Sequence, residues 1–195
     1  MMRLIVITEP GFPPSEAEAI RMLLDEGIDR VHLRKPGAEE AGLRRLIEAL
    51  PPACYPKLSL HDRLPLACDY GLGGVHLNGR NPAAPAGFRG SVSRSCHSLA
   101  ELAAAGGEDY LFLSPVFDSL SKAGYRAGFA DGQLREAAAA GTIGPRTVAL
   151  GGIVPERLPL VREWGFGGAA VLGYIWKNGS VREMMRCVRR LKRFV

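Results

Sequence analysis

Eight short apolar or β-branched runs recur along the chain, and this recurrence restricts the fold more than any other feature of the sequence. Segments with helical periodicity separate most of the runs, and several of these segments open on Ser, Asp or Pro and close on Gly. Strands that alternate with helices form a parallel sheet, and strands as apolar as these are covered on both faces. The runs are "LIVIT" from Leu4, "RVHLR" from Arg30, "KLSL" from Lys57, "GVHL" from Gly74, "SVSRS" from Ser91, "YLFLSPV" from Tyr110, "TVALGGI" from Thr147 and "GAAVLGYI" from Gly168.

Eight such units predict an α/β fold of the closed (β/α)₈ type, a TIM barrel, with residues 1–195 as a single domain. The connection between Leu77 and Ser91, "NGRNPAAPAGFRG", holds two prolines and three glycines. These residues favour a loop or a single turn, so we expect the helix after the fourth strand to be short or missing. An open doubly wound sheet is the structural alternative, but no G-x-G-x-x-G follows the first strand to support a dinucleotide site.

Charge and cysteine usage narrow the class of protein. The four cysteines form no C-x-x-C pair, and the first apolar run is too short for a signal peptide, so we expect reduced thiols and a cytoplasmic protein. The net charge is +5, and many of the cations lie in "SVREMMRCVRRLKRF", mostly opposite an apolar helical stripe. No aromatic residue interleaves with the arginines there, so we expect a solvated helix face and no nucleic-acid partner. No apolar stretch approaches the roughly 18 residues of a membrane span, so we expect no membrane partner.

Histidines mark the C-terminal ends of the expected strands, where TIM barrels carry their chemistry. His61 with Asp62 is the strongest pair, because a carboxylate at the barrel mouth can hold a cation or a proton. His32 can face the mouth, whereas His76 is better explained as a buried core histidine. For His97, helix capping and a role in the site are equally good explanations. No cluster has the ligand spacing of a zinc site.

Glycines and hydroxyls in the second half of the chain predict a phosphate site. Glycines after strands seven and eight let the backbone approach an anion closely, at the end of the barrel where phosphate is often bound. The loop after strand six, in "SPVFDSLSKAG", adds Ser119, Ser121 and Lys122. The residues of this predicted site are Gly151, Gly152, Gly173, Ser119, Ser121 and Lys122.

From "LIVIT" to "VLGYI", the chain resembles the thiamine-phosphate synthase and TenI family of compact (β/α)₈ barrels. No single motif carries the resemblance, which depends on the joint order and spacing of several. These are "HLRK" from His32, "HDR" from His61, "GVHLNGRN" from Gly74, "SCH" from Ser95, "SPVFDSLSK" from Ser114 and "LGGI" from Leu150.

The resemblance implies a transferase of thiamine biosynthesis, which joins an aminopyrimidine methyl pyrophosphate to a thiazole phosphate and releases pyrophosphate. In that reaction Mg²⁺ and basic residues stabilise the leaving pyrophosphate, and the thiazole nitrogen captures a pyrimidine cation. The implied partners are thus small-molecule phosphates and pyrophosphates, and a homodimer is also implied because members are often dimers. The implied site has Arg34 and Lys122 on pyrophosphate, Ser95, Ser119, Ser121, Gly151, Gly152 and Gly173 on substrate or phosphate, and Asp62 on Mg²⁺ with Asn81 as a weaker ligand. His32 and His61 are further catalytic candidates because of their place at the strand ends.

Departures from the synthase pattern leave two alternatives open. Synthases carry glutamine where this chain has His32, asparagine where it has His61, and a second metal-binding aspartate where it has Asn81, which weakens the case for Mg²⁺. A TenI-like thiazole tautomerase, which works by acid–base chemistry, suits the extra histidines. However, Pro115 occupies the position of the tautomerase histidine, as in synthases, so we predict a synthase-like transferase. A non-catalytic binder of thiazole or thiamine phosphate is the third hypothesis.

Overall fold

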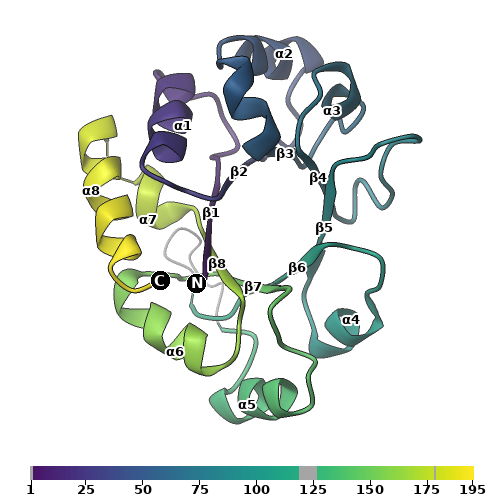
Figure 1. Cartoon of the computed structure of the whole chain (residues 1–195), viewed down its shortest axis with the longest axis vertical. Coiled ribbons are helices and arrows are strands. Elements are labelled where there is room, and N and C mark those ends of the chain that lie inside the picture. The colour runs from purple at the N-terminus through teal and green to yellow at the C-terminus, as the bar shows by residue number, and fades with distance from the viewer. Residues whose placement is uncertain (1, 119–126, 178) are drawn as a thin grey trace.

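The computed structural model describes residues 2–118, 127–177 and 179–195. Eight parallel strands close into a barrel in chain order, with β1 paired to both β2 and β8 (Figure 1). The predicted TIM barrel is therefore confirmed, and the open-sheet alternative is excluded. The strands are β1 (Arg3–Ile7), β2 (Arg30–Leu33), β3 (Leu58–Leu60), β4 (Gly74–Leu77), β5 (Ser91–Cys96), β6 (Tyr110–Leu113), β7 (Thr147–Leu150) and β8 (Gly168–Val171).

Helices form an outer ring around the strands (Figure 1). Residues 78–90, all of them described, form no helix between β4 and β5, which confirms the predicted missing helix. The described helices are α1 (Glu16–Asp25), α2 (Glu40–Glu48), the 3₁₀ helix η1 (Pro52–Lys57), α3 (Leu66–Asp69), α4 (Leu99–Ala104), α5 (Asp131–Ala139), the 3₁₀ helix η2 (Pro155–Arg157), α6 (Leu158–Glu163), α7 (Gly173–Trp176) and α8 (Val181–Lys192).

The strands separate an outer apolar core from a smaller core inside the barrel. Because side chains alternate along a strand, Leu4 and Val6 of β1 pack with the helices, while Ile5 and Ile7 belong to the inner cluster. Tyr110, Phe112, Val148 and Ala170, from β6 to β8, complete the inner cluster. On the other side of the barrel, β2 to β5 contribute the fully buried polar side chains His32, Ser59, His76 and Ser93. The barrel interior is therefore half apolar and half polar.

The arginine-rich segment forms α8, as its periodicity predicts. Its buried side chains are those of the expected stripe, including Met185 and Val188. On the outer surface Arg189 pairs with Glu26, and Arg190 pairs with Glu156 at 2.9 Å. Among the described residues, no helix is both long enough and apolar enough to cross a bilayer.

Candidate active site

A cavity of about 340 Å³ opens at the C-terminal ends of the strands, where the sequence predicts the site. Its lining comes from strands on both sides of the barrel and from the loops that follow them. Six of the predicted site residues lie in this lining: Arg34, His61, Ser95, Gly151, Gly152 and Gly173.

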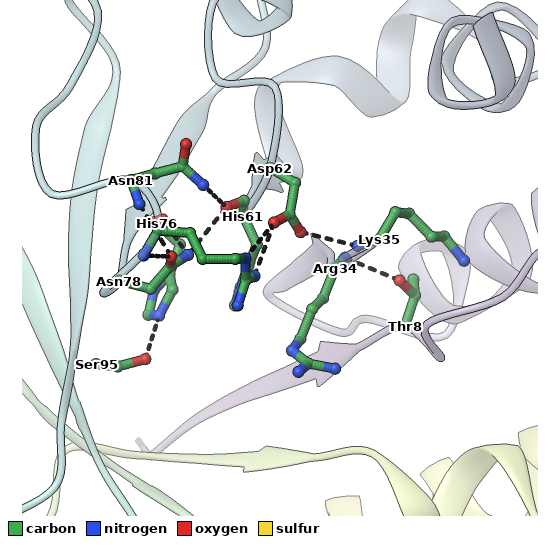
Figure 2. Close-up of polar contacts among 10 residues, drawn as sticks. Thr8, Arg34, Lys35, His61, Asp62, His76, Asn78, Asn81 and Ser95 are labelled. Carbon is green, nitrogen blue, oxygen red and sulfur yellow. Dashed lines mark hydrogen bonds and ion pairs between the residues drawn. The ribbon is translucent and has the colours of Figure 1, made fainter. Parts of the chain in front are cut away.

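Of the two adjacent cations that follow β2, only Arg34 lines the cavity. Its backbone amide donates to the Thr8 hydroxyl at 3.0 Å, which fixes the chain as it leaves the strand. Lys35 extends in a different direction (Figure 2) and is 1 % exposed, with its ammonium 2.6 Å from a carboxylate oxygen of Glu16. Lys35 is thus a structural cation, and Arg34 is the basic residue that follows β2 into the site.

Three histidines form a cluster at the cavity floor: His32, His61 and His76. His32 Nδ1 lies 2.8 Å from His61 Nε2, and His32 Nε2 lies 2.7 Å from the Tyr110 hydroxyl. His61 stacks on His76 with ring centroids 4.0 Å apart. His61 lines the cavity and the other two do not, so His32 contacts the cavity lining through His61 and Phe112.

Burial keeps this cluster uncharged. Desolvation is the largest cause that lowers the pKa of His32 and of His61 well below the usual value, and the neighbouring histidines lower both further. Burial, with help from Arg94 and Arg34, also lowers the pKa of His76 to about 3. His76 is a buried core histidine, as the sequence predicts, and its two nitrogens lie 2.8 Å from the hydroxyls of Ser93 and Ser95. Because Ser95 lines the cavity, the cluster meets the site through neutral polar groups.

Asp62, the predicted metal ligand, is already engaged on both carboxylate oxygens. Arg80 donates to Oδ1 from Nε at 3.1 Å and from Nη2 at 2.7 Å. The backbone amide of Lys35 donates to Oδ2 at 3.1 Å, as Figure 2 shows. The only carboxylate predicted to bind metal is therefore neutralised by a guanidinium in this structure.

Asn81, the weaker metal candidate, belongs to a tight turn with Asn78. The backbone amides and carbonyls of the two residues bond each other at 3.0 Å in both directions. Both side-chain amides donate to the carbonyl of His61 at 2.9 Å (Figure 2). Asn81 does not line the cavity, and its side chain ties the loop after β4 to the end of β3.

Across the barrel, backbone groups line the cavity after β7 and β8. Gly151 and Gly152 adopt φ of 103° and 63°, a region that glycine occupies without strain. A Cβ on Gly152 would lie 2.2 Å from the carbonyl oxygen of Asp118, so a side chain has no room there. Gly173 is the first residue of α7, and the first backbone amides of a helix have no intrahelical acceptor. The glycine side of the cavity thus presents main chain to a ligand.

The predicted residues Ser119, Ser121 and Lys122 lie outside the described residues. Sequence reasoning missed Arg80, which lines the cavity beside Gly79. The signal was a cation within the short polar turn "NGRN", directly before the asparagine considered for metal binding. His97 also lines the cavity, which favours its site role over capping; Ser98 caps α4 by accepting from the Glu101 amide at 3.0 Å.

Comparison with known proteins places this geometry in a family. The model of the family described as thiamine monophosphate synthase matches residues 4–175. The chain belongs to the thiamine monophosphate synthase family. The resemblance drawn from its motifs is therefore confirmed.

Individual members of the family match nearly the whole chain. A thiamine-phosphate synthase of Rhizobium etli is 33% identical over 173 residues, which cover 83% of this chain and 84% of that protein. One from Methanoculleus marisnigri is 29% identical and covers 95% of this chain and 93% of its own length. The crystal structure of a thiamine phosphate pyrophosphorylase from Bacteroides thetaiotaomicron superposes with a TM-score of 0.89 at 34% identity, covering 99% of this chain and 97% of that one. These consistent names favour the synthase over the tautomerase and the binder.

Proposed function

We propose that this chain is a transferase of thiamine biosynthesis, which joins an aminopyrimidine methyl pyrophosphate to a thiazole phosphate and releases pyrophosphate. One observation on the cavity supports this proposal in addition to family membership. The cavity has arginines on its β2 and β4 side and glycine main chain on its β7 and β8 side. Since β4 and β8 lie opposite each other in a closed ring of eight strands, the cavity can hold two anionic groups at a distance from each other.

The arginine side suits the leaving group. Pyrophosphate departs with its negative charge, and guanidinium groups bind phosphate oxygens through pairs of parallel N–H donors. The backbone amide of Arg34 donates to the Thr8 hydroxyl, which fixes the main chain that carries the Arg34 side chain in the cavity lining. Hydrogen-bond donors that face the place where negative charge develops lower the barrier of the reaction, because they need little reorganisation in the transition state.

The glycine side suits the phosphate of the thiazole. Exposed amides after a barrel strand bind phosphate in many TIM barrels, and a glycine lets the anion approach the main chain. The roles of Gly151, Gly152 and Gly173 as donors to this phosphate, and those of Ser119, Ser121 and Lys122, stay predictions from the resemblance. The homodimer and the cytoplasmic location stay predictions as well.

Between the two anion sites, the cavity suits a short-lived organic cation. Ile7, Phe112 and Leu172 belong to its lining, and these apolar side chains exclude water that would otherwise capture the cation. The pKa of His61 is lowered by burial, so its ring remains neutral at the cavity floor and adds no positive charge beside the cation.

The described residues do not fit the Mg²⁺ ion that the resemblance implies. Mg²⁺ in proteins is held by carboxylates together with substrate phosphates and water. Asp62 already receives Arg80 on one oxygen and the Lys35 amide on the other, and Asn81 is tied to the His61 carbonyl. Mg²⁺ therefore remains only what the resemblance implies, and none of the steps above depends on it.

The test is turnover by the purified chain. The two substrates are incubated with the protein, once with Mg²⁺ and once with EDTA, and thiamine phosphate is measured by chromatography. We expect product with release of one pyrophosphate for each thiamine phosphate. If no product forms under either condition while the protein is folded, the proposed function is wrong.

A further inference from the structure

Arg80 lies beside the carboxylate that the sequence predicts as a metal ligand, a position where a cation is expected. It lines the cavity, and its guanidinium sits against Asp62, the one carboxylate that the sequence assigns to a metal. Both N–H donors in this contact reach the same oxygen, Oδ1, at 3.1 and 2.7 Å. A guanidinium has five N–H donors, so three remain for a ligand in the cavity.

The turn that carries Arg80 is built to keep it at this place. The Arg80 backbone amide donates to the side-chain oxygen of Asn78 at 2.9 Å. Asn78 and Asn81 pair through their main chains, and both side chains bind the carbonyl of His61, the residue before Asp62. The loop after β4 is thus fastened to the end of β3, which brings Arg80 and Asp62 together.

Arg34 adds a second guanidinium to the same cavity. Burial lowers the pKa of Arg34, Arg80 lowers it further, and Asp62 opposes this change, so the two arginines are near enough to repel. Two guanidinium groups and one carboxylate leave one positive charge in excess. A pair of carboxylates would need a metal to attract pyrophosphate, whereas this group attracts an anion by itself.

We propose that Arg80 supplies the positive charge that a divalent metal would otherwise supply, and that Arg80 and Arg34 together bind the pyrophosphate group without a metal. The proposal rests on the proposed function in one respect, the identity of the anion as pyrophosphate. The Arg80 side chain is 51% exposed and that of Asp62 is 11% exposed, so the buried carboxylate holds one edge of the guanidinium while the other N–H donors stay open to a ligand. Asp62 then acts as a positioning residue for Arg80.

The test is calorimetric titration of inorganic pyrophosphate into the full chain, in EDTA and again with Mg²⁺. The wild-type chain is expected to bind in EDTA, with no tightening by Mg²⁺. Arg80→Ala is expected to weaken binding in EDTA by about tenfold or more, because charge-assisted hydrogen bonds are lost. The matched control is Arg89→Ala, which removes an exposed arginine of the same loop outside the cavity lining and is expected to leave binding unchanged.

Asp62→Asn separates the two roles of the carboxylate. If Asp62 only positions Arg80, this variant still binds pyrophosphate in EDTA. The proposal is overturned if the wild-type chain binds only with Mg²⁺ and Asp62→Asn abolishes that binding, or if Arg80→Ala binds as tightly as wild type. A folded protein that binds pyrophosphate in EDTA but makes no thiamine phosphate would contradict the proposed function and leave this inference standing.

Discussion

The imidazole of His61 lies flat against that of His76, with ring centroids 4.0 Å apart and planes inclined by 21°. Two rings in such contact, both buried, cannot both be charged, since each charge would lack solvent and repel the other. The pKa of His76 falls to about 3, mainly through burial, and burial likewise lowers the pKa of His61. The barrel interior therefore depends on neutral histidines.

Stability is expected to fall as the pH drops from 7 toward 5. In the unfolded chain these histidines bind protons below about pH 6.5, whereas in the folded chain they stay neutral, so the unfolded state binds more protons. Each neutral histidine then costs about 1.4 kcal/mol of stability per pH unit below that value. Urea unfolding at pH 7 and pH 5.5 measures this slope.

A matched pair of variants assigns the slope to the cluster. His76→Gln is expected to make the free energy of unfolding less dependent on pH, whatever its effect at pH 7. The comparison variant His97→Gln replaces an exposed histidine outside the cluster and keeps the three buried rings. Equal slopes in the wild type and His76→Gln would show that His76 does not contribute.

Gly152→Ala is expected to destabilise the chain and to weaken binding of a phosphate ligand. Its φ of 63° strains any other residue, and the new Cβ would lie 2.2 Å from the carbonyl oxygen of Asp118. The expected loss in the free energy of unfolding is about 1–3 kcal/mol. Gly132→Ala on α5, where no heavy atom lies within 4 Å of the added Cβ, is the control and is expected to lose no stability. Equal stability of the two variants would contradict the close approach at Gly152.

Lys35→Met is expected to destabilise the fold without a specific effect on the reaction. The Lys35 ammonium is buried 2.6 Å from Glu16, so removing it leaves a buried carboxylate without its cation, at a cost of about 3–5 kcal/mol. Lys35→Met combined with Glu16→Leu is expected to recover much of this loss, as measured by urea unfolding. If a well-folded double variant has lost turnover, Lys35 has a role in the site that its position in the structure does not explain.

The sequence predicted the barrel well because the patterns that indicate strands and loops are local and recur along the chain. Each strand is a short apolar run, and the missing helix after β4 follows from the prolines and glycines of residues 78–90. The strand period also explains why Arg34, two residues after the inward His32, enters the cavity, whereas Lys35 turns away. The alternation of side chains along each strand and the composition of the loops thus determine the barrel and the face to which many strand side chains point.

The site was less predictable because its decisive contacts join residues far apart in the chain. Arg80 binds Asp62 from a loop in which Asn78 and Asn81 both bind the His61 carbonyl, and no periodicity reveals such bonds. A comparison of motifs considers Asp62 and Asn81 as metal ligands. It does not identify Arg80, which precedes Asn81 in the sequence and binds Asp62. Non-local hydrogen bonds, not propensities, determine which charge faces the cavity.

Arg34→Ala is expected to lower kcat/KM for the aminopyrimidine pyrophosphate by about a hundredfold or more, because removing a preorganised donor at developing charge costs that much in other enzymes. The guanidinium is half-buried in the cavity lining, whereas the matched control, Arg45→Ala, removes an exposed arginine of α2 and is expected to leave turnover unchanged. Arg34→Lys keeps the charge but loses the planar pair of donors, so its rate should lie between those of the wild type and Arg34→Ala. Steady-state kinetics with the thiazole phosphate saturating measures all three variants. If Arg34→Ala keeps wild-type kcat/KM, the leaving group does not bind on the β2 side of the barrel, and the arrangement of the two anions proposed here is wrong.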